Sequence, residues 1–155
     1  MKSRLLGLAA VALLAAACSG DDNDSASTDA PPDDAVVVVG TATCSFPEDP
    51  DAPDYSVQCE HTVSDPRVSG AEVSTGYTFV ENPGSVGFTW AAEDNVITNA
   101  DGTWRGTIHG VDDGSGGVRG EAHLLGEGAY EGLEYHYYLD GFEQVEVMGW
   151  ISGGG

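Results

Sequence analysis

The chain has 155 residues, of which 26 are acidic and only 5 are Lys or Arg, so its formal net charge is -21. This charge argues against nucleic-acid binding, which needs a basic surface, and against adsorption to an anionic bilayer surface. The hydrophobic fraction of 41% is typical of a folded chain, and the length leaves room for one domain.

Residues 1–17 have the pattern of a secretory signal peptide, with Lys2 and Arg4 ahead of an apolar run. That run, 5–17, is too short to span a bilayer as a helix, which takes about 20 residues. The segment Leu13-Leu14-Ala15-Ala16-Ala17-Cys18 resembles a bacterial lipobox, except that Ala15 stands where a large aliphatic residue is usual. The resemblance implies export, cleavage before Cys18, and a lipid such as palmitate on Cys18 that anchors the chain to the outer side of a bacterial membrane.

The segment after Cys18 is predicted to be a flexible acidic linker. Residues 19–34 contain six Asp, two Pro and no large apolar side chain, so they bury too little surface to offset the entropy of ordering. The chain is therefore divided into a lipoprotein signal peptide at 1–17, a lipidated Cys with its linker at 18–34, and a folded domain at 35–155.

From Ala35 onward the hydrophobic pattern has a period of two, and turn signals recur about every ten residues. The pattern predicts eight strands, at 36–46, 55–64, 72–80, 87–92, 103–111, 118–125, 134–139 and 143–151. The expected fold is all-β, a single antiparallel up-and-down barrel, because closing the sheet removes its exposed edges. A two-sheet β-sandwich is the alternative.

Cys44 and Cys59 are the pair that remains once Cys18 carries the lipid. An even pair in an exported, oxidising setting predicts a disulfide bond, with a free reactive thiol as the alternative. Placing these two residues opposite each other also places Ala42 opposite His61 on an apolar face. His61 is therefore expected to be a core histidine whose hydrogen bonds are satisfied.

The second hairpin collects ionisable groups of both signs. Pairing Trp104 with Leu124 gives one apolar face and one polar face, with Arg105 opposite His123. The polar face is interpreted either as an outer wall or as a pocket in which Glu121 exchanges protons with a histidine. Its members are Arg105, Thr107, His109, Arg119, Glu121 and His123.

A third hairpin, turning at Asp140-Gly141, carries two tyrosines on its apolar face. A three-residue loop places Tyr135 opposite Val147, Tyr137 opposite Val145 and His136 opposite Glu146. The tyrosines either line a cavity for a small ligand or fill the barrel, because eight strands enclose just enough space for one or the other.

The glycine-rich segment 126–133 has no helix after it and no Lys near it, so it is not a phosphate loop. Its glycines are expected to supply a compact turn, with Tyr130 packed over the barrel end.

Four segments carry a resemblance to a group of exported bacterial proteins: 64–70, 102–106, 128–133 and 149–151. A meander with a Gly-x-Tyr-x-Gly-Leu turn before its last hairpin is similar to the barrel of allene oxide cyclases and dirigent proteins. No catalytic residue of those families is carried over to this chain.

No further enzyme motif, cofactor motif or metal-binding motif is identified, and two functional hypotheses remain. The first is a non-catalytic surface lipoprotein whose barrel binds a small apolar ligand or a protein partner. The second is a cyclase or isomerase that uses Glu121 with His109 or His123, and it requires these side chains to point into the barrel. The candidate ligand-binding residues are Arg105, His109, Glu121, His123, Tyr135 and Tyr137.

Overall fold

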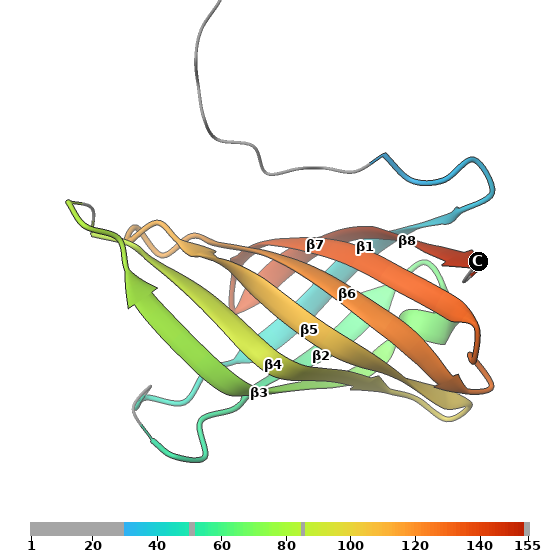
Figure 1. Ribbon diagram of the computed structural model, residues 1–155, viewed down its shortest axis with the longest axis horizontal. Coiled ribbons are helices and arrows are strands. Elements are labelled where there is room, and N and C mark those ends of the chain that lie inside the picture. The colour runs from blue at the N-terminus through green and yellow to red at the C-terminus, as the bar shows by residue number, and fades with distance from the viewer. Residues whose placement is uncertain (1–29, 50–51, 85, 154–155) are drawn as a thin grey trace, which may run out of the picture. The chain divides into compact units, whose positions relative to one another are not determined.

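The computed structural model describes residues 30–49, 52–84 and 86–153, and the unit Pro31–Gly155 forms a closed eight-stranded antiparallel barrel (Figure 1). Each strand pairs with the next along the chain, and the last pairs with the first, so the predicted barrel is confirmed and the sandwich is not. The strands are β1 Val36–Ser45, β2 Val57–Val63, β3 Gly70–Glu81, β4 Phe88–Thr98, β5 Gly102–Asp112, β6 Val118–Gly128, β7 Leu133–Phe142 and β8 Gln144–Gly153.

The predicted signal peptide, Cys18 and most of the predicted linker lie outside the described residues. Across the part that is described, the structure contains no helix long and apolar enough to cross a membrane.

Alternation along the strands separates a packed interior from an outer wall. The largest fully buried side chains are Trp104, Tyr135, Tyr137, Ile97 and Leu124. The apolar face predicted for the second hairpin is therefore the core, as expected.

The first hairpin has the predicted register. Cys44 lies opposite Cys59 and forms a disulfide bond with it, and Ala42 lies opposite His61. The predicted disulfide bond between Cys44 and Cys59 is thus confirmed.

The second hairpin is shifted by two residues from its predicted register. Trp104 pairs with Gly126, not with Leu124, and His109 lies opposite Glu121. The strands run further into the turn than expected, down to the pair Asp112 and Val118. A shift of two keeps every side chain on its predicted face.

The third hairpin is shifted by four residues, because it turns at Glu143 and not at Asp140-Gly141. Glu143 adopts a φ of 48°, and its neighbours Phe142 and Gln144 pair with each other. Tyr137 consequently lies opposite Gly149, where a Cβ atom would come within 2.7 Å of the tyrosine Cβ. The sequence signal for this register is Gly149, which lets the two strands approach closely at Tyr137.

Strand β4 ends six residues later than predicted, at Thr98 instead of residue 92. The polar run Glu93-Asp94-Asn95 indicates a loop, but a β-bulge between Ala92 and Asn95 lets the strand continue to Thr98. The bulge turns Asn95 inwards, where it is fully buried.

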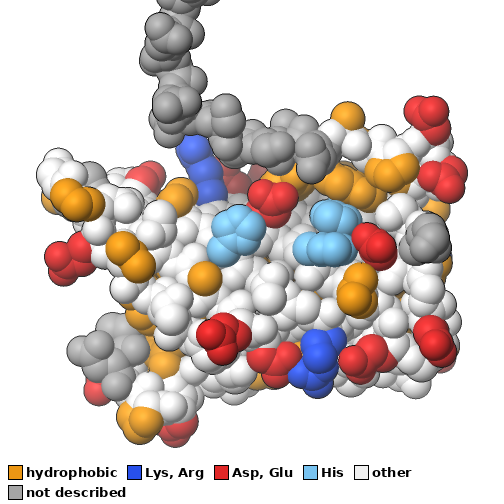
Figure 2. All heavy atoms as spheres, viewed as in Figure 1, with side chains coloured by type: hydrophobic (Ala, Val, Ile, Leu, Met, Phe, Trp, Pro, Cys, Tyr) orange, Lys and Arg blue, Asp and Glu red, His pale blue; other side chains and the backbone are white. Residues whose placement is uncertain are grey.

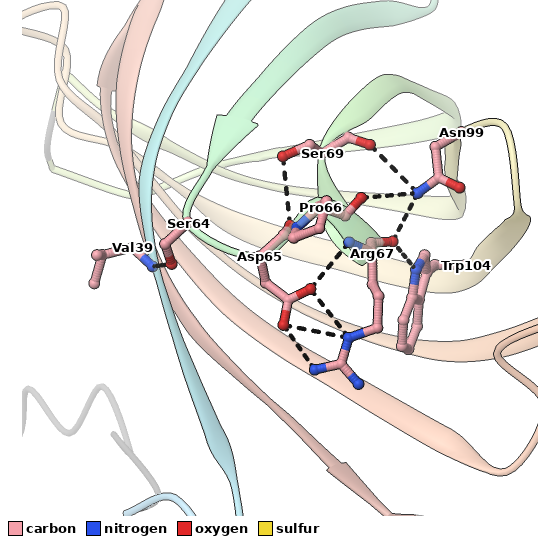
Figure 3. A network of polar contacts seen from close by, with 8 residues as sticks. All are labelled: Val39, Ser64, Asp65, Pro66, Arg67, Ser69, Asn99 and Trp104. Carbon is pink, nitrogen blue, oxygen red and sulfur yellow. Dashed lines mark hydrogen bonds and ion pairs between the residues drawn. The ribbon is translucent and has the colours of Figure 1, made fainter.

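One end of the barrel is closed by the 3-10 turn η1, Pro66–Val68, and its polar contacts (Figure 3). The Arg67 carbonyl accepts hydrogen bonds from Trp104 Nε1 at 2.7 Å and from Asn99 Nδ2 at 2.8 Å. Tyr130 stacks on the Trp104 ring and donates to Asn99 Oδ1 at 2.8 Å, which confirms that Tyr130 packs over the barrel end. We call this the closed end.

We expect replacement of both Cys44 and Cys59 by Ala to lower the free energy of unfolding by about 3 kcal/mol, the loop entropy of a 15-residue crosslink. Urea denaturation monitored by circular dichroism would measure this. Cys18→Ser is the matched control, and equal losses in both variants would contradict the prediction.

The closed end should also respond to pH through Asp65. The hydrogen bond from the Arg67 side chain, with the backbone hydrogen bond and the charge of that residue, lowers the pKa of Asp65 below its ordinary 3.8. A carboxyl with a lowered pKa stabilises the fold above its unfolded pKa, and this stabilisation is lost as the pH falls through the folded pKa.

We therefore expect Asp65→Asn to melt below the wild type at pH 5 to 7, and the gap to narrow once the pH falls below about 4. Thermal midpoints measured across this range would test it, with Asp33→Asn, an exposed residue ahead of β1, as the control. A gap that stays constant down to the lowest pH would show that the charge of Asp65 plays no part.

Candidate functional site

The other end of the barrel contains a cavity of about 210 Å³. It lies at the end of the barrel where β1, β3, β5 and β7 end and where β2, β4, β6 and β8 begin. The residues that line it are Cys44, Phe46, Pro47, Tyr55, Val57, Cys59, Glu72, Ser74, Tyr77, Phe79, Phe88, Trp90, Ile108, Asp112, Val118, Leu139, Phe142 and Val145. We call this the open end.

Aromatic side chains form the rim of the cavity. Phe46 stacks on Phe142 at a ring distance of 5.0 Å, and Tyr55 packs edge-on against Tyr77 at 5.1 Å and Phe79 at 5.7 Å. Phe142 is 47% exposed and Phe79 is 40% exposed. Apolar rings therefore face solvent around a hollow, an arrangement typical of small-ligand sites.

Two glycines make room for the Trp90 side of the cavity. A Cβ atom at Gly110 would come within 2.6 Å of the Trp90 ring, and one at Gly120 within 3.0 Å. The indole therefore lies over the backbone of β5 and β6, against the barrel wall, where it lines the cavity.

The floor of the cavity is polar. Glu72 and Ser74 line it, and both are buried. Deeper in the barrel, the Tyr137 hydroxyl donates a hydrogen bond to Glu72 Oε2 at 2.8 Å. The same carboxylate oxygen is in contact with His61 Nε2. Ser74 Oγ donates to Asn95 Oδ1 at 2.9 Å, and Asn95 Nδ2 donates to the Tyr137 hydroxyl at 2.8 Å. We call these five residues the polar floor.

The surroundings of Tyr137 in the polar floor keep its hydroxyl protonated and neutral. Burial, reinforced by the nearby charge of Glu72, raises the pKa of Tyr137 well above its usual value. Burial raises the pKa of Tyr77 and Tyr135 in the same direction. The phenols thus act as hydrogen-bond partners and not as bases, and Glu72 is the group that can accept a hydrogen bond from a bound molecule.

Two buried polar atoms among the described residues have no hydrogen-bond partner, His61 Nδ1 and the Tyr135 hydroxyl. The expectation of a fully satisfied core histidine at His61 is met only at Nε2. Such orphaned atoms each carry a desolvation cost of about 1 to 3 kcal/mol.

Of the predicted candidates, Tyr135 and Tyr137 point inwards. Tyr137 belongs to the polar floor, and Tyr135 packs between it and Trp104 in the filled part of the barrel. Neither ring lines the cavity, so this pair supports the site from behind.

The other four candidates lie on the outer wall. Arg105 pairs with Asp94, and His123 Nε2 lies 3.1 Å from Glu134 Oε2. Glu121 accepts a hydrogen bond from Tyr138 at 3.3 Å, and His109 is exposed. The structure therefore places Arg105, His109, Glu121 and His123 outside, and the condition set for the cyclase hypothesis is not met.

The hydrophobic pattern of the sequence does not predict the polar floor. Glu72 and Ser74 alternate with Val73, which is exposed, so the polar side chains of β3 face inwards here. The interior face then passes to Tyr77 and Phe79, because the alternation slips by one residue at Gly76, whose φ is 70°. A period-two pattern cannot reveal a face that changes within the strand.

Comparison of this chain with family models, curated proteins and solved structures finds no match. The similarity to allene oxide cyclase and dirigent barrels therefore stays a prediction.

The two interior tyrosines offer a matched test of the polar floor. Tyr137→Phe removes a hydroxyl that Asn95 and Glu72 both contact, so we expect a loss of about 1 to 3 kcal/mol in the free energy of unfolding. Tyr135→Phe removes a buried hydroxyl without a partner, and we expect no loss or a small gain. Chemical denaturation measures both, and equal effects would contradict the assignment of the network.

Proposed function

We propose that this protein is a membrane-anchored extracytoplasmic lipoprotein whose barrel binds a small, mainly apolar ligand at its open end. The observation that carries the proposal is the cavity itself, with aromatic walls and a polar floor in a barrel that is otherwise filled by side chains. The lipid on Cys18 is the proposed anchor, and binding without catalysis is the proposed activity.

The charge of the lining narrows the ligand class. Glu72 and Asp112 are the carboxylic acids in it, and the described residues that line the cavity include no Lys, Arg or His. An anionic ligand would meet carboxylates without a compensating cation, and desolvating it would be costly. We therefore propose a neutral or cationic ligand with an apolar body and a hydrogen-bonding group that reaches Ser74 or Glu72.

The cyclase or isomerase alternative has to use the polar floor instead of Glu121. Glu72 and His61 are in contact and buried, which is the pairing that general acid–base chemistry needs. A ligand recovered from the barrel with its chromatographic retention unchanged after prolonged incubation favours binding, whereas conversion to an isomer of the same mass but different retention favours the enzyme.

The test is native mass spectrometry of the purified chain, with and without denaturation, together with titration of a neutral fluorescent apolar probe. We expect Val145→Phe to fill the cavity and weaken probe binding about tenfold or more, because Val145 is 2% exposed and lines it. Overpacking costs about 1 to 3 kcal/mol, so folding is checked by circular dichroism.

Val37→Phe is the control, the same substitution at an exposed outer position of β1. Equal probe binding by the wild type and Val145→Phe would overturn the cavity as the binding site. Loss of binding in Val37→Phe alone would instead place the probe site on the outer wall.

A further inference from the structure

A cluster of two imidazoles and one carboxylate lies on the outer wall, away from the cavity lining. His123 is on β6, Glu134 and His136 are on β7, and His123 lies directly opposite His136 in the sheet. Glu134 and His136 are two positions apart on one strand, so they share a face. Histidine side chains gather beside acidic ones on this face of the molecule (Figure 2).

The donor atoms of this trio are spaced for one metal ion. Glu134 Oε2 lies 3.1 Å from His123 Nε2 and 3.8 Å from His136 Nε2, and one donor atom from each residue lies within 4.8 Å of the others. A tetrahedral Zn²⁺ ion with bonds of 2.0 to 2.2 Å separates its donor atoms by about 3.3 to 3.6 Å. The donor atoms are therefore near that spacing, and rotation of the exposed His123 side chain is the adjustment that binding requires.

The trio is accessible yet held in place. The side chains of His123, Glu134 and His136 are 48%, 35% and 27% exposed, so an ion can reach them from solvent. The His136 ring stacks on Trp150 at 5.2 Å with an interplanar angle of 5°, and on His123 at 4.0 Å. The stack on Trp150 orders the His136 imidazole, whereas the exposed His123 ring has to turn out of its stack on His136 so that both nitrogen lone pairs point at one ion.

We propose that His123, Glu134 and His136 bind a divalent transition-metal ion of the Zn²⁺ class. Two imidazoles and a carboxylate suit Zn²⁺, Cu²⁺ or Ni²⁺ better than Ca²⁺ or Mg²⁺, which prefer oxygen ligands. Three protein ligands leave one coordination position of a tetrahedral ion free for water or a further ligand. The site is independent of the cavity, because none of its residues lines it.

Isothermal titration of the purified full chain, stripped with a chelator, with ZnCl₂ tests the proposal. We expect one high-affinity site that excess Mg²⁺ does not compete for. His123→Ala and Glu134→Gln should each weaken Zn²⁺ binding by about 10- to 100-fold or more, since loss of even an outer-shell partner costs this much. His123 is exposed, so its replacement should leave the fold intact, as circular dichroism would verify.

His109→Ala is the matched control, because His109 is an exposed imidazole that also faces a carboxylate across the sheet, Glu121. Its affinity for Zn²⁺ should equal that of the wild type. Equal weakening in His109→Ala, or no weakening in His123→Ala, would show diffuse binding to an acidic surface and overturn the site.

Trp150 supplies a second measurement. Cu²⁺ bound beside His136 should quench its fluorescence, and Trp150→Phe should lose that part of the quenching while it still binds Zn²⁺. Quenching that survives unchanged in Trp150→Phe would place the ion elsewhere.

Discussion

The closure of eight strands into one sheet is the constraint on which the rest of the molecule depends. It fixes an interior just wide enough to be filled by side chains or to hold one small ligand. This barrel is filled by side chains at one end and contains a cavity at the other. Trp104, Tyr130 and the turn η1 fill one end, while at the other Gly110 and Gly120 let Trp90 lie against the wall and a hollow remains. The position of large rings and glycines thus decides where a ligand has room.

The polar floor is the boundary between these two halves. Burying Glu72 is costly unless it is paired, and the contacts of Glu72 Oε2 with the Tyr137 hydroxyl and with His61 Nε2 supply that pairing. A network of this kind rigidifies what surrounds it, because each member depends on the others. It also leaves the cavity with hydrogen-bonding groups at its base, so the ligand can be oriented as well as enclosed.

The sequence predicted the barrel, the disulfide and the two faces of each tested hairpin, because closure and period-two alternation are visible in composition and spacing. It did not predict the register of the second and third hairpins, since a shift of two or four preserves every face. It also missed the inward turn of Asn95 and the slip at Gly76, where bulged strands break the period. The polar floor depends on the bulge that turns Asn95 inwards, and so the floor could not be found from alternation.

The same alternation explains why one strand can serve two sites. On β7, Tyr135 and Tyr137 face the interior, and His136 between them faces outwards to His123 and Trp150. Only the observed register places His136 opposite Trp150, whereas the predicted one would have placed it opposite Glu146. The predicted and the observed register place the same side chains on the outer wall, but they bring different outer side chains into contact. The contact between His136 and Trp150 thus depends on the position of the turn at Glu143, whose carbonyl accepts a hydrogen bond from the backbone of Cys44 and so ties that turn to β1.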